Sequence, residues 1–416
     1  MPVNRTILIL IVFCLLFLSL VVAAATAQMD EPAPTALPAD TAAASSDVTH
    51  KPRSVAPTPE LIEQLRLPEG FTIRPFARSV GQARMLAVGE DGTVYVTCPK
   101  QGQVKALLDR DNDGKSDETR IMLYNLPGVH GIAIHDNRMY LAGSNSVWVV
   151  SLGGYGTAGE PKTLIDNLPD PGTPGLHPYR GLAIHDHRVY VSVGSTCNAC
   201  DEKSREYAVI LRTSLDGSQR ENFAGGLRNT VGFDWHPLSG KMWGMDQGTE
   251  DRGGDGLPDE LNRLEAGEIY GWPWLYAERR WDDEAPKPYL GNDTRQSFAR
   301  NTTPSVMTYQ PLSHPTGFLF YTGQMFPGRY QRGAFVAMHG SDTRPEAVGY
   351  KIVFLRFGLD GEPAAEFEEF LTGFLIADGK AQFGRPAGLV VDQQGALLFS
   401  DDEHGVVYRV TYKAPQ

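Results

Sequence analysis

A unit of two short strands joined by a turn recurs between Leu67 and Tyr412, and this repetition constrains the fold more than any other feature. Two copies are close, HGIAIHDNRMYLAGSN from His130 and RGLAIHDHRVYVSVGS from Arg180. Looser copies begin at Arg84, Val231, Thr316 and Arg385. In each copy, apolar strands rich in β-branched or aromatic residues flank a turn of Asp, Asn, Gly or Pro residues.

The spacing of the copies is typical of propeller blades. Successive copies mostly begin about 45 to 60 residues apart, with a longer insertion at 251–310, and no amphipathic helical pattern of any length interrupts them. Six units fit between Leu67 and Tyr412. The sequence therefore predicts an all-β fold, a six-bladed β-propeller in which the innermost strand of each blade lines an axial channel.

The N-terminal segment predicts export. Residues 1–27 combine a basic start, an apolar run and the small residues Ala23 to Ala27, which is typical of a signal peptide cleaved after Ala27. The apolar run is also long enough to span a bilayer, so an uncleaved anchor is the alternative. Residues 28–60, rich in Ala, Pro, Thr and Ser, predict a disordered linker, and 61–416 form the propeller domain. Either reading places that domain in the periplasm or outside the cell.

Net charge and cysteine content exclude some classes of protein function. The net charge of -12 argues against a nucleic-acid binder, which would need a basic face. In an exported chain, Cys197 and Cys200 predict a local disulfide, since no βαβ pattern supports a redox pair of the thioredoxin kind. Cys98 is left over and is expected to be buried. Cys200 is followed by Asp201, so the pair is not a haem-attachment motif.

Aligning the copies places basic side chains just before the inner strands, at three offsets from the first strand glycine. Arg84, His130 and Arg180 share one offset, and His177, Arg228, His314 and Arg385 stand two or three residues earlier. Blade symmetry would gather these side chains around one mouth of the channel, which predicts a site for an anionic ligand. Taken one at a time, each is equally compatible with a solvated loop.

An acidic loop predicts a calcium site. Asp109, Asp111 and Asp113 alternate in a DxDxDG run, with Asp117 shortly after. Alternate carboxylates on a tight loop offer the oxygen ligands that Ca²⁺ takes. The alternative is an acidic β-turn without a metal.

Several segments together resemble one family. These segments are GLRNTVGFDW, EIYGWPW, HPTGFLFYTG, AFVAMHGSDTRPEAVGYKIVF and GRPAGLVVD. They are similar to the glucose/sorbosone dehydrogenase family, soluble six-bladed propellers that use pyrroloquinoline quinone (PQQ) with calcium, and most of all to its sorbosone dehydrogenase-like branch. The resemblance extends from about Leu67 to Tyr412.

The resemblance implies roles for single residues. His177 matches the catalytic histidine, a general base that takes the proton of the substrate hydroxyl while hydride passes to the quinone. Arg228 would stabilise the charge that develops on the quinone oxygen, and Asn229 would help to hold the cofactor. His339, Arg344 and Arg385 match positions near the cofactor carboxylates, and the basic ring adds His130 and Arg180 to this set.

The family's catalytic calcium would bind the carbonyls of Gly248 and Thr249. Thr249 stands where the glucose dehydrogenase branch has proline, and the loop through Asp259 is longer, so the ligands of this calcium stay open.

The resemblance implies a periplasmic dehydrogenase that oxidises an aldose or a related alcohol or aldehyde and passes electrons to a cytochrome or a quinone. One alternative is a calcium-dependent propeller lactonase or other hydrolase, which would need carboxylates where the blade starts offer His and Arg. The other is a non-catalytic propeller that binds a protein or glycan.

Overall fold

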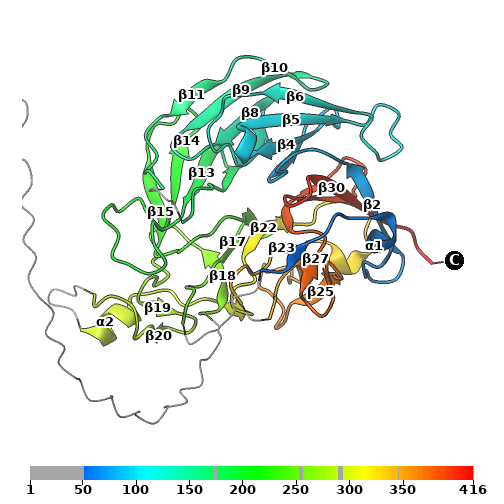
Figure 1. Cartoon of the computed structure of the whole chain (residues 1–416). Helices are drawn as coiled ribbons and strands as arrows, with labels where there is room; N and C mark the ends of the chain where they lie inside the picture. The colour runs from blue at the N-terminus through cyan, green and yellow to red at the C-terminus, as the bar shows by residue number, and fades with distance from the viewer. Residues whose placement is uncertain (1–50, 172–175, 253–255, 289–293, 345, 416) are drawn as a thin grey trace, which may run out of the picture. The chain divides into compact units, whose positions relative to one another are not determined.

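The computed structural model describes residues 51–171, 176–252, 256–288, 294–344 and 346–415 (Figure 1). The chain divides into the units Met1–Ser46 and Asp47–Gln416, and every described residue belongs to the second. The predicted signal peptide or anchor at 1–27, and the linker as far as residue 50, lie outside the described residues. Within the described part, no helix is both long and apolar enough to cross a bilayer.

Six antiparallel sheets of four or five strands build the described part of the chain. The first three contain β3 (Leu86–Val88), β4 (Val94–Cys98), β5 (Gln103–Leu108) and β6 (Glu118–Leu123); β7 (Gly131–His135), β8 (Arg138–Ala142), β9 (Val147–Gly154), β10 (Thr157–Ala158) and β11 (Lys162–Ile165); and β12 (Leu182–His185), β13 (Arg188–Val193), β14 (Val209–Ser214) and β15 (Glu221–Gly225). The other three contain β16 (Phe233–Trp235), β17 (Met242–Asp246), β18 (Asp259–Leu264) and β21 (Met307–Tyr309); β22 (Pro315–Phe320), β23 (Ala334–Met338), β24 (Lys351–Leu355) and β25 (Glu368–Leu371); and β28 (Pro386–Val391), β29 (Leu397–Asp401), β30 (Val406–Tyr412) and β2 (Phe71–Ala77). The all-β class predicted from the repeats is confirmed.

Smaller elements lie at the margins of these sheets. They are β1 (Arg53–Ser54), β26 (Leu375–Ile376), β27 (Ala381–Gln382), β19 (Leu275–Tyr276), β20 (Arg280–Trp281), the helices α1 (Pro59–Glu63) and α2 (Arg295–Arg300), and 3-10 turns at Pro99–Gln101 and Gly328–Tyr330.

The predicted disordered linker, 28–60, extends too far toward the C-terminus, because regular structure begins before residue 60. Both β1 and the start of α1 fall inside 28–60, so its last residues are structured. The N–H groups of Arg53 and Val55 donate to the carbonyls of Lys380 and Gln382, at 2.9 and 2.8 Å. Composition misled the prediction because these bonds use the backbone, which pairs with β27 whatever side chains it carries.

The hairpins of the repeat follow from their turn residues. Asp136 and Asn137 both have positive φ, 48° and 55°, and Asp186 and His187 do too, at 45° and 56°. Two consecutive residues of this kind make the tight turn whose twist suits an antiparallel hairpin. Each hairpin therefore returns the chain to the end of the sheet from which its inner strand began.

The inner strands β3, β7, β12, β16, β22 and β28 lie beside one another in sequence order. Their glycines permit backbone contact: a Cβ on Gly181 would lie 2.1 Å from the Val231 carbonyl oxygen, and one on Gly317 would lie 2.4 Å from that of Ala387. The six strands together line one narrow cavity of about 100 Å³. The residues just before these strands are therefore brought together.

The first and last long strands share a sheet. Strand β2 pairs with β30 in antiparallel register, Phe71 opposite Tyr412, and Figure 1 shows the blue and red ribbons side by side. The hydroxyls of Thr72 and Thr411 lie 2.9 Å apart across this pair. Closing the chain through one sheet that contains its first and last long strands leaves fewer exposed strand edges.

Replacing Gly181 by Ala is expected to destabilise the protein by about 1–3 kcal/mol, because the added methyl would overlap the Val231 carbonyl and push β12 from β16. Urea denaturation measures the loss. Gly328→Ala is the control, since its φ is not positive and no atom lies within 4 Å of the position that the new methyl would take. Equal stability of the two variants would contradict the close contact.

Candidate active site

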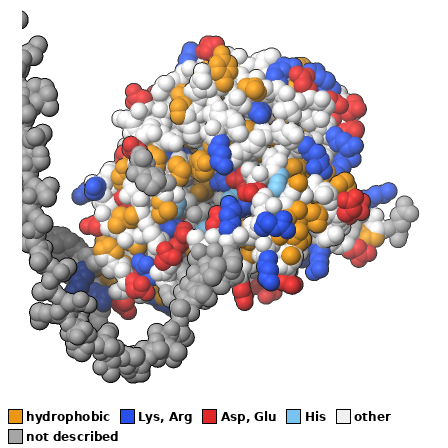
Figure 2. Space-filling view, in the orientation of Figure 1, with side chains coloured by type: hydrophobic (Ala, Val, Ile, Leu, Met, Phe, Trp, Pro, Cys, Tyr) orange, Lys and Arg blue, Asp and Glu red, His pale blue; other side chains and the backbone are white. Residues whose placement is uncertain are grey.

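A pocket of about 350 Å³ opens beside the starts of the inner strands. The side chains that carry charge or polar groups into it are Lys51, Gln82, Arg84, Lys100, His177, Tyr179, Asn229, Gln247, Glu250, His314, His339, Asp342, Arg385, Asp402 and Glu403. Figure 2 shows basic and acidic side chains intermixed with histidine on the visible face of the molecule. Of the eight residues predicted to be catalytic or to bind the cofactor, four line this pocket: His177, Asn229, His339 and Arg385.

His177 is held in one tautomer. Its Nδ1 lies 3.0 Å from both the carbonyl oxygen and the hydroxyl of Ser195, and that hydroxyl itself donates to the Cys197 carbonyl at 2.7 Å. A carbonyl only accepts, so Nδ1 carries the proton and Nε2 keeps its lone pair. Burial, helped by Arg228, lowers the pKa of His177 to about 3. The ring is therefore neutral at physiological pH.

Arg228 does not line the pocket itself, and its side chain is only 1% exposed. Its backbone N–H donates to Asp246 at 2.8 Å, which fixes the start of the inner strand. Its Nη2 donates to Glu250 at 3.2 Å, while Nη1 is buried without a hydrogen-bond partner among the described residues. Burial lowers the pKa of Arg228, and Glu250 opposes that effect. One N–H edge of a buried guanidinium is thus left for a ligand.

Asn229 also has an unpartnered polar atom. Its Nδ2 donates to Gln247 at 2.9 Å, and Gln247 donates onward to the Pro315 carbonyl at 3.0 Å, so the amide orientation is set. Its Oδ1 is buried and has no hydrogen-bond partner among the described residues. A Cβ on Gly194 would lie 2.7 Å from this oxygen and 2.6 Å from the Cβ of His177. Gly194 is needed for the two side chains to sit together.

A second cluster lies across the pocket. Arg84 donates to Asp402 at 2.8 Å, and His339 Nε2 lies 2.8 Å from the other Asp402 oxygen. Burial alone would raise the pKa of Asp402, but His339 and Arg84 together hold it well below its usual range. Burial lowers the pKa of His339 to about 4. Arg385 adds bonds to the His339 and Gly340 carbonyls.

The prediction missed the acids of this pocket. Glu250, Asp342 and Asp402 stand among the basic residues, where the blade starts had predicted only His and Arg. They come from the ends of the second strands, just after β17, β23 and β29. Because the strands are antiparallel, those ends meet the starts of the inner strands at one mouth. An alignment of the segments that end these second strands, GMDQGTE, AMHGSD and FSDDE, would have shown an acid shortly after each strand.

Three predicted cofactor residues do not line the pocket. His130 is fully buried and accepts from Arg84 at 3.1 Å, so it orients that side chain. Arg180 is also fully buried, and donates to three carbonyls, those of Ser144, His177 and Pro169. Arg344 donates to the Pro311 carbonyl at 3.1 Å.

Gly248 and Thr249 border a separate small cavity of about 20 Å³, which Asp246 and Glu260 also line. The Thr249 carbonyl accepts from the Leu257 N–H at 2.7 Å, and the Gly248 N–H donates to Asp259 at 3.0 Å. Burial raises the pKa of Glu260 to about 8. The calcium site at these carbonyls stays a prediction.

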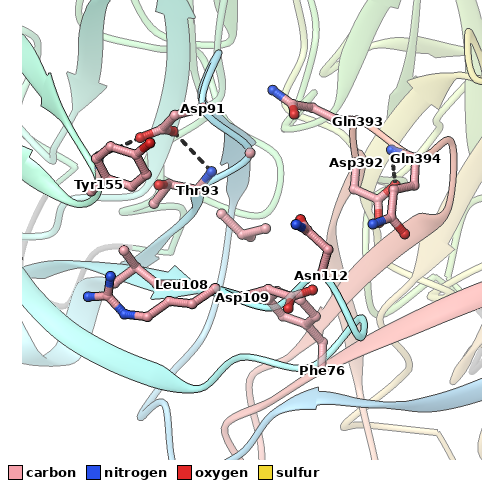
Figure 3. Close-up of a pocket in the computed structure, with 13 residues that line it drawn as sticks. Phe76, Asp91, Thr93, Leu108, Asp109, Asn112, Tyr155, Asp392, Gln393 and Gln394 are labelled. Atoms are coloured by element: carbon pink, nitrogen blue, oxygen red, sulfur yellow. Dashed lines mark hydrogen bonds between the residues drawn. The ribbon is translucent and has the colours of Figure 1, made fainter.

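The DxDxDG loop brings three of its four predicted ligands together. One carboxylate oxygen from each of Asp109, Asp111 and Asp117 lies within 4.8 Å of the others. Asp113 is not part of this group, and its carboxylate accepts from the Lys115 N–H at 2.8 Å. Asp109 and Asn112 lie on one side of a pocket of about 320 Å³ (Figure 3). Burial, together with the charges of Asp113 and Asp111, raises the pKa of Asp109.

If this loop binds calcium, Asp109→Asn should lower the number of Ca²⁺ ions bound per chain by one, because the amide offers a single, uncharged oxygen. Calorimetric titration of the metal-free protein measures the number. Asp378→Asn, the same change at an exposed acid elsewhere, is the control. If the wild type, Asp109→Asn and Asp378→Asn bind the same number of Ca²⁺ ions per chain, the loop is an acidic turn that binds no metal.

The two cysteine predictions are confirmed. Cys197 and Cys200 form a disulfide, and Cys98 is free and fully buried. Burial raises the pKa of the Cys98 thiol to about 11, so it is unreactive.

The chain matches two protein families. Residues 182–342 match the glucose/sorbosone dehydrogenase family, and residues 65–257 and 284–413 match the family described as TrAA12-like. The second match covers well over half of the sequence, and the chain belongs to the TrAA12-like family. The predicted resemblance to glucose/sorbosone dehydrogenases is confirmed.

Relatives with similar sequences come from distant organisms. An uncharacterised protein of Borreliella burgdorferi is 28% identical over 373 residues, covering 85% of this chain and 92% of that protein. A pyrroloquinoline quinone-dependent sugar dehydrogenase of Hypocrea jecorina is 26% identical over 218 residues, covering 44% of this chain and 46% of that enzyme.

Solved structures share the fold. A Trichoderma reesei protein of carbohydrate-active enzyme family AA12 superposes with a TM-score of 0.73 at 21% identity, covering 84% of this chain and 98% of that one. The PQQ domain of a Coprinopsis cinerea pyranose dehydrogenase gives 0.69 at 20% identity, covering 86% and 98%. At these identities the likeness establishes a propeller-like fold.

Proposed function

We propose that this protein is a PQQ-dependent oxidoreductase that oxidises an aldose-type sugar or a related alcohol or aldehyde. One observation carries the proposal: a neutral His177 with its proton on Nδ1 lines the pocket, and the nearby Arg228 has a buried Nη1 without a hydrogen-bond partner among the described residues. That pairs a proton acceptor with a stabiliser of negative charge, as removal of a hydride and a proton from an alcohol requires. The PQQ-dependent relatives support this reading.

The residues present fit such a cofactor. Arg228 Nη1 and Asn229 Oδ1 are buried polar atoms without protein partners among the described residues, which a polar ligand would satisfy. The side chains of Lys51, Arg84 and Arg385 reach the same pocket and suit the carboxylates of PQQ. When bound, PQQ would supply the two-electron acceptor that the side chains lack.

Charge balance supports a metal beside the cofactor. The pocket lining holds four basic side chains and four acidic ones: Lys51, Arg84, Lys100 and Arg385 against Glu250, Asp342, Asp402 and Glu403. A tri-carboxylate would meet no net positive charge from these eight groups. We therefore propose that Ca²⁺ supplies it; the carbonyls of Gly248 and Thr249, which the family resemblance implies as ligands, border the smaller cavity that shares Gln247 with this pocket.

His177 would act as the general base. Its Nδ1–H is engaged by Ser195, so Nε2 is available to take the proton of a substrate hydroxyl, and the new imidazolium would be stabilised through the same carbonyl. Arg228 would donate through Nη1 to the oxygen on which negative charge develops. Asn229, held by Gln247, would orient the ligand between them.

The finer architecture belongs to the same proposal. The six four- or five-stranded sheets, with inner strands adjacent in sequence order, support six blades around one channel. An exported enzyme of this kind would work in the periplasm or outside the cell and pass electrons to a cytochrome or a quinone.

A metal-dependent hydrolase is less well supported. Such an enzyme would need carboxylates free to bind a channel metal, but Asp402 is paired with Arg84 and His339, and Glu250 with Arg228. These acids are already neutralised by the protein.

Reconstitution tests the proposal. Purified protein incubated with PQQ and Ca²⁺ is expected to reduce a redox dye with at least one sugar or alcohol in a panel. His177→Ala should lower kcat by about 100- to 10,000-fold, the range for loss of a general base, while PQQ still binds. The exposed His187→Ala is the control. Absence of both PQQ binding and dye reduction would defeat the proposal, and full activity of His177→Ala would defeat the assignment of the base.

A further inference from the structure

The disulfide loop presents Asn198 to one whole edge of the Arg228 guanidinium. The Asn198 carbonyl oxygen accepts from Arg228 Nε at 3.1 Å, and Asn198 Oδ1 accepts from Nη2 at 3.0 Å. Two oxygens of one residue thus meet two N–H groups of the planar fork, which fixes the direction of the fork as well as its position.

The same side chain holds the loop that carries Glu250. Asn198 Oδ1 accepts from the Glu250 N–H at 2.9 Å, and Asn198 Nδ2 donates to the Glu250 carbonyl at 2.8 Å. The Glu250 carboxylate in turn accepts from Arg228 at 3.2 Å. Asn198, Arg228 and Glu250 therefore form a closed set, to which Trp272 adds a bond to the Asn198 carbonyl at 3.3 Å.

The disulfide places this residue. Cys197 and Cys200 bracket Asn198 in a short covalent ring, so its backbone has little freedom. The Cys197 carbonyl also accepts from the Ser195 hydroxyl, and Ser195 holds His177 Nδ1. The disulfide loop thus contacts both proposed catalytic side chains: it binds Arg228 directly, through Asn198, and reaches His177 through Ser195.

We infer that Asn198, fixed by the Cys197–Cys200 disulfide, is a positioning residue that sets the direction of the Arg228 guanidinium, whose buried Nη1 has no hydrogen-bond partner among the described residues. The inference rests on the proposed function, in which Arg228 acts on the reacting groups. Without the amide, the buried guanidinium would lose an acceptor on the edge that Asn198 now fills, and the Glu250 loop would lose both side-chain bonds to Asn198. Reducing the disulfide should loosen the same contacts.

Kinetics of the reconstituted enzyme give the first test. Asn198→Ala is expected to lower kcat about 100-fold, the effect of misplacing a catalytic group, with little change in KM. Asn198→Asp keeps the Oδ1 acceptor for both Arg228 and the Glu250 N–H, so it should recover most of the loss. Ala199→Ser, the adjacent change inside the disulfide loop, is the control. Equal kcat in Asn198→Ala and Ala199→Ser would overturn the inference.

Hydrogen exchange of the cofactor-free protein gives a second test that does not depend on turnover. The Glu250 amide donates to Asn198 Oδ1, so a peptide containing it should exchange faster in Asn198→Ala and at the wild-type rate in Asn198→Asp and Ala199→Ser. If the wild type neither binds PQQ nor turns over, the proposed function fails, and exchange still decides whether Asn198 holds the loop. Unchanged exchange in Asn198→Ala would refute the positioning.

The role of the disulfide is tested by replacing both cysteines. Cys197→Ser with Cys200→Ser should lower kcat and speed Glu250 exchange in the direction of Asn198→Ala. Adding Asn198→Ala to that pair should cost less than it does in the wild type, since both changes act through one contact. Wild-type kcat and exchange in the cysteine variant would show that the loop holds Asn198 without the bond.

Discussion

The site depends on the backbone contact between neighbouring inner strands. Gly181 and Gly317 leave no room for a side chain between their strands and the next, so the starts of those strands converge. A residue placed just before such a strand has to lie near its counterparts from the other sheets. The convergence of His177, Asn229 and Arg385 on one pocket follows from this constraint rather than from any local sequence preference.

Burial then sets the chemistry of the converged side chains. Burial removes most of the water around His177 and His339 and lowers their pKa values to about 3 and about 4, so both imidazoles are neutral at physiological pH. Arginines remain charged when buried, and each of the three that matter has a carboxylate beside it: Glu250 for Arg228, Asp402 for Arg84 and Asp342 for Arg385. The result is a pocket with strong local fields and little net charge.

Much of this arrangement is readable in the sequence. The all-β class followed from the strand repeat, the offsets of His177 and Arg385 before their inner strands pointed to one mouth, and the family resemblance added His339. His130 and Arg180 share an offset with Arg84, which lines the pocket, yet they are fully buried and do not line it, because an offset fixes the backbone position and packing fixes the side-chain direction. Asn198 gave no signal, since its role depends on a contact between residues far apart in the chain.

The protonation state of His177 tests the account most directly. In the cofactor-free protein at pH 7, ¹⁵N NMR of the His177 ring should show a protonated Nδ1 and an unprotonated Nε2, and the same spectrum should persist to pH 5, because burial holds its pKa at about 3. His187→Ala and His177→Ala spectra assign the signal. A proton on Nε2 at pH 7, or an imidazolium that forms at about pH 6.5, the ordinary value for histidine, would contradict the claim that the fold prepares this residue as a base.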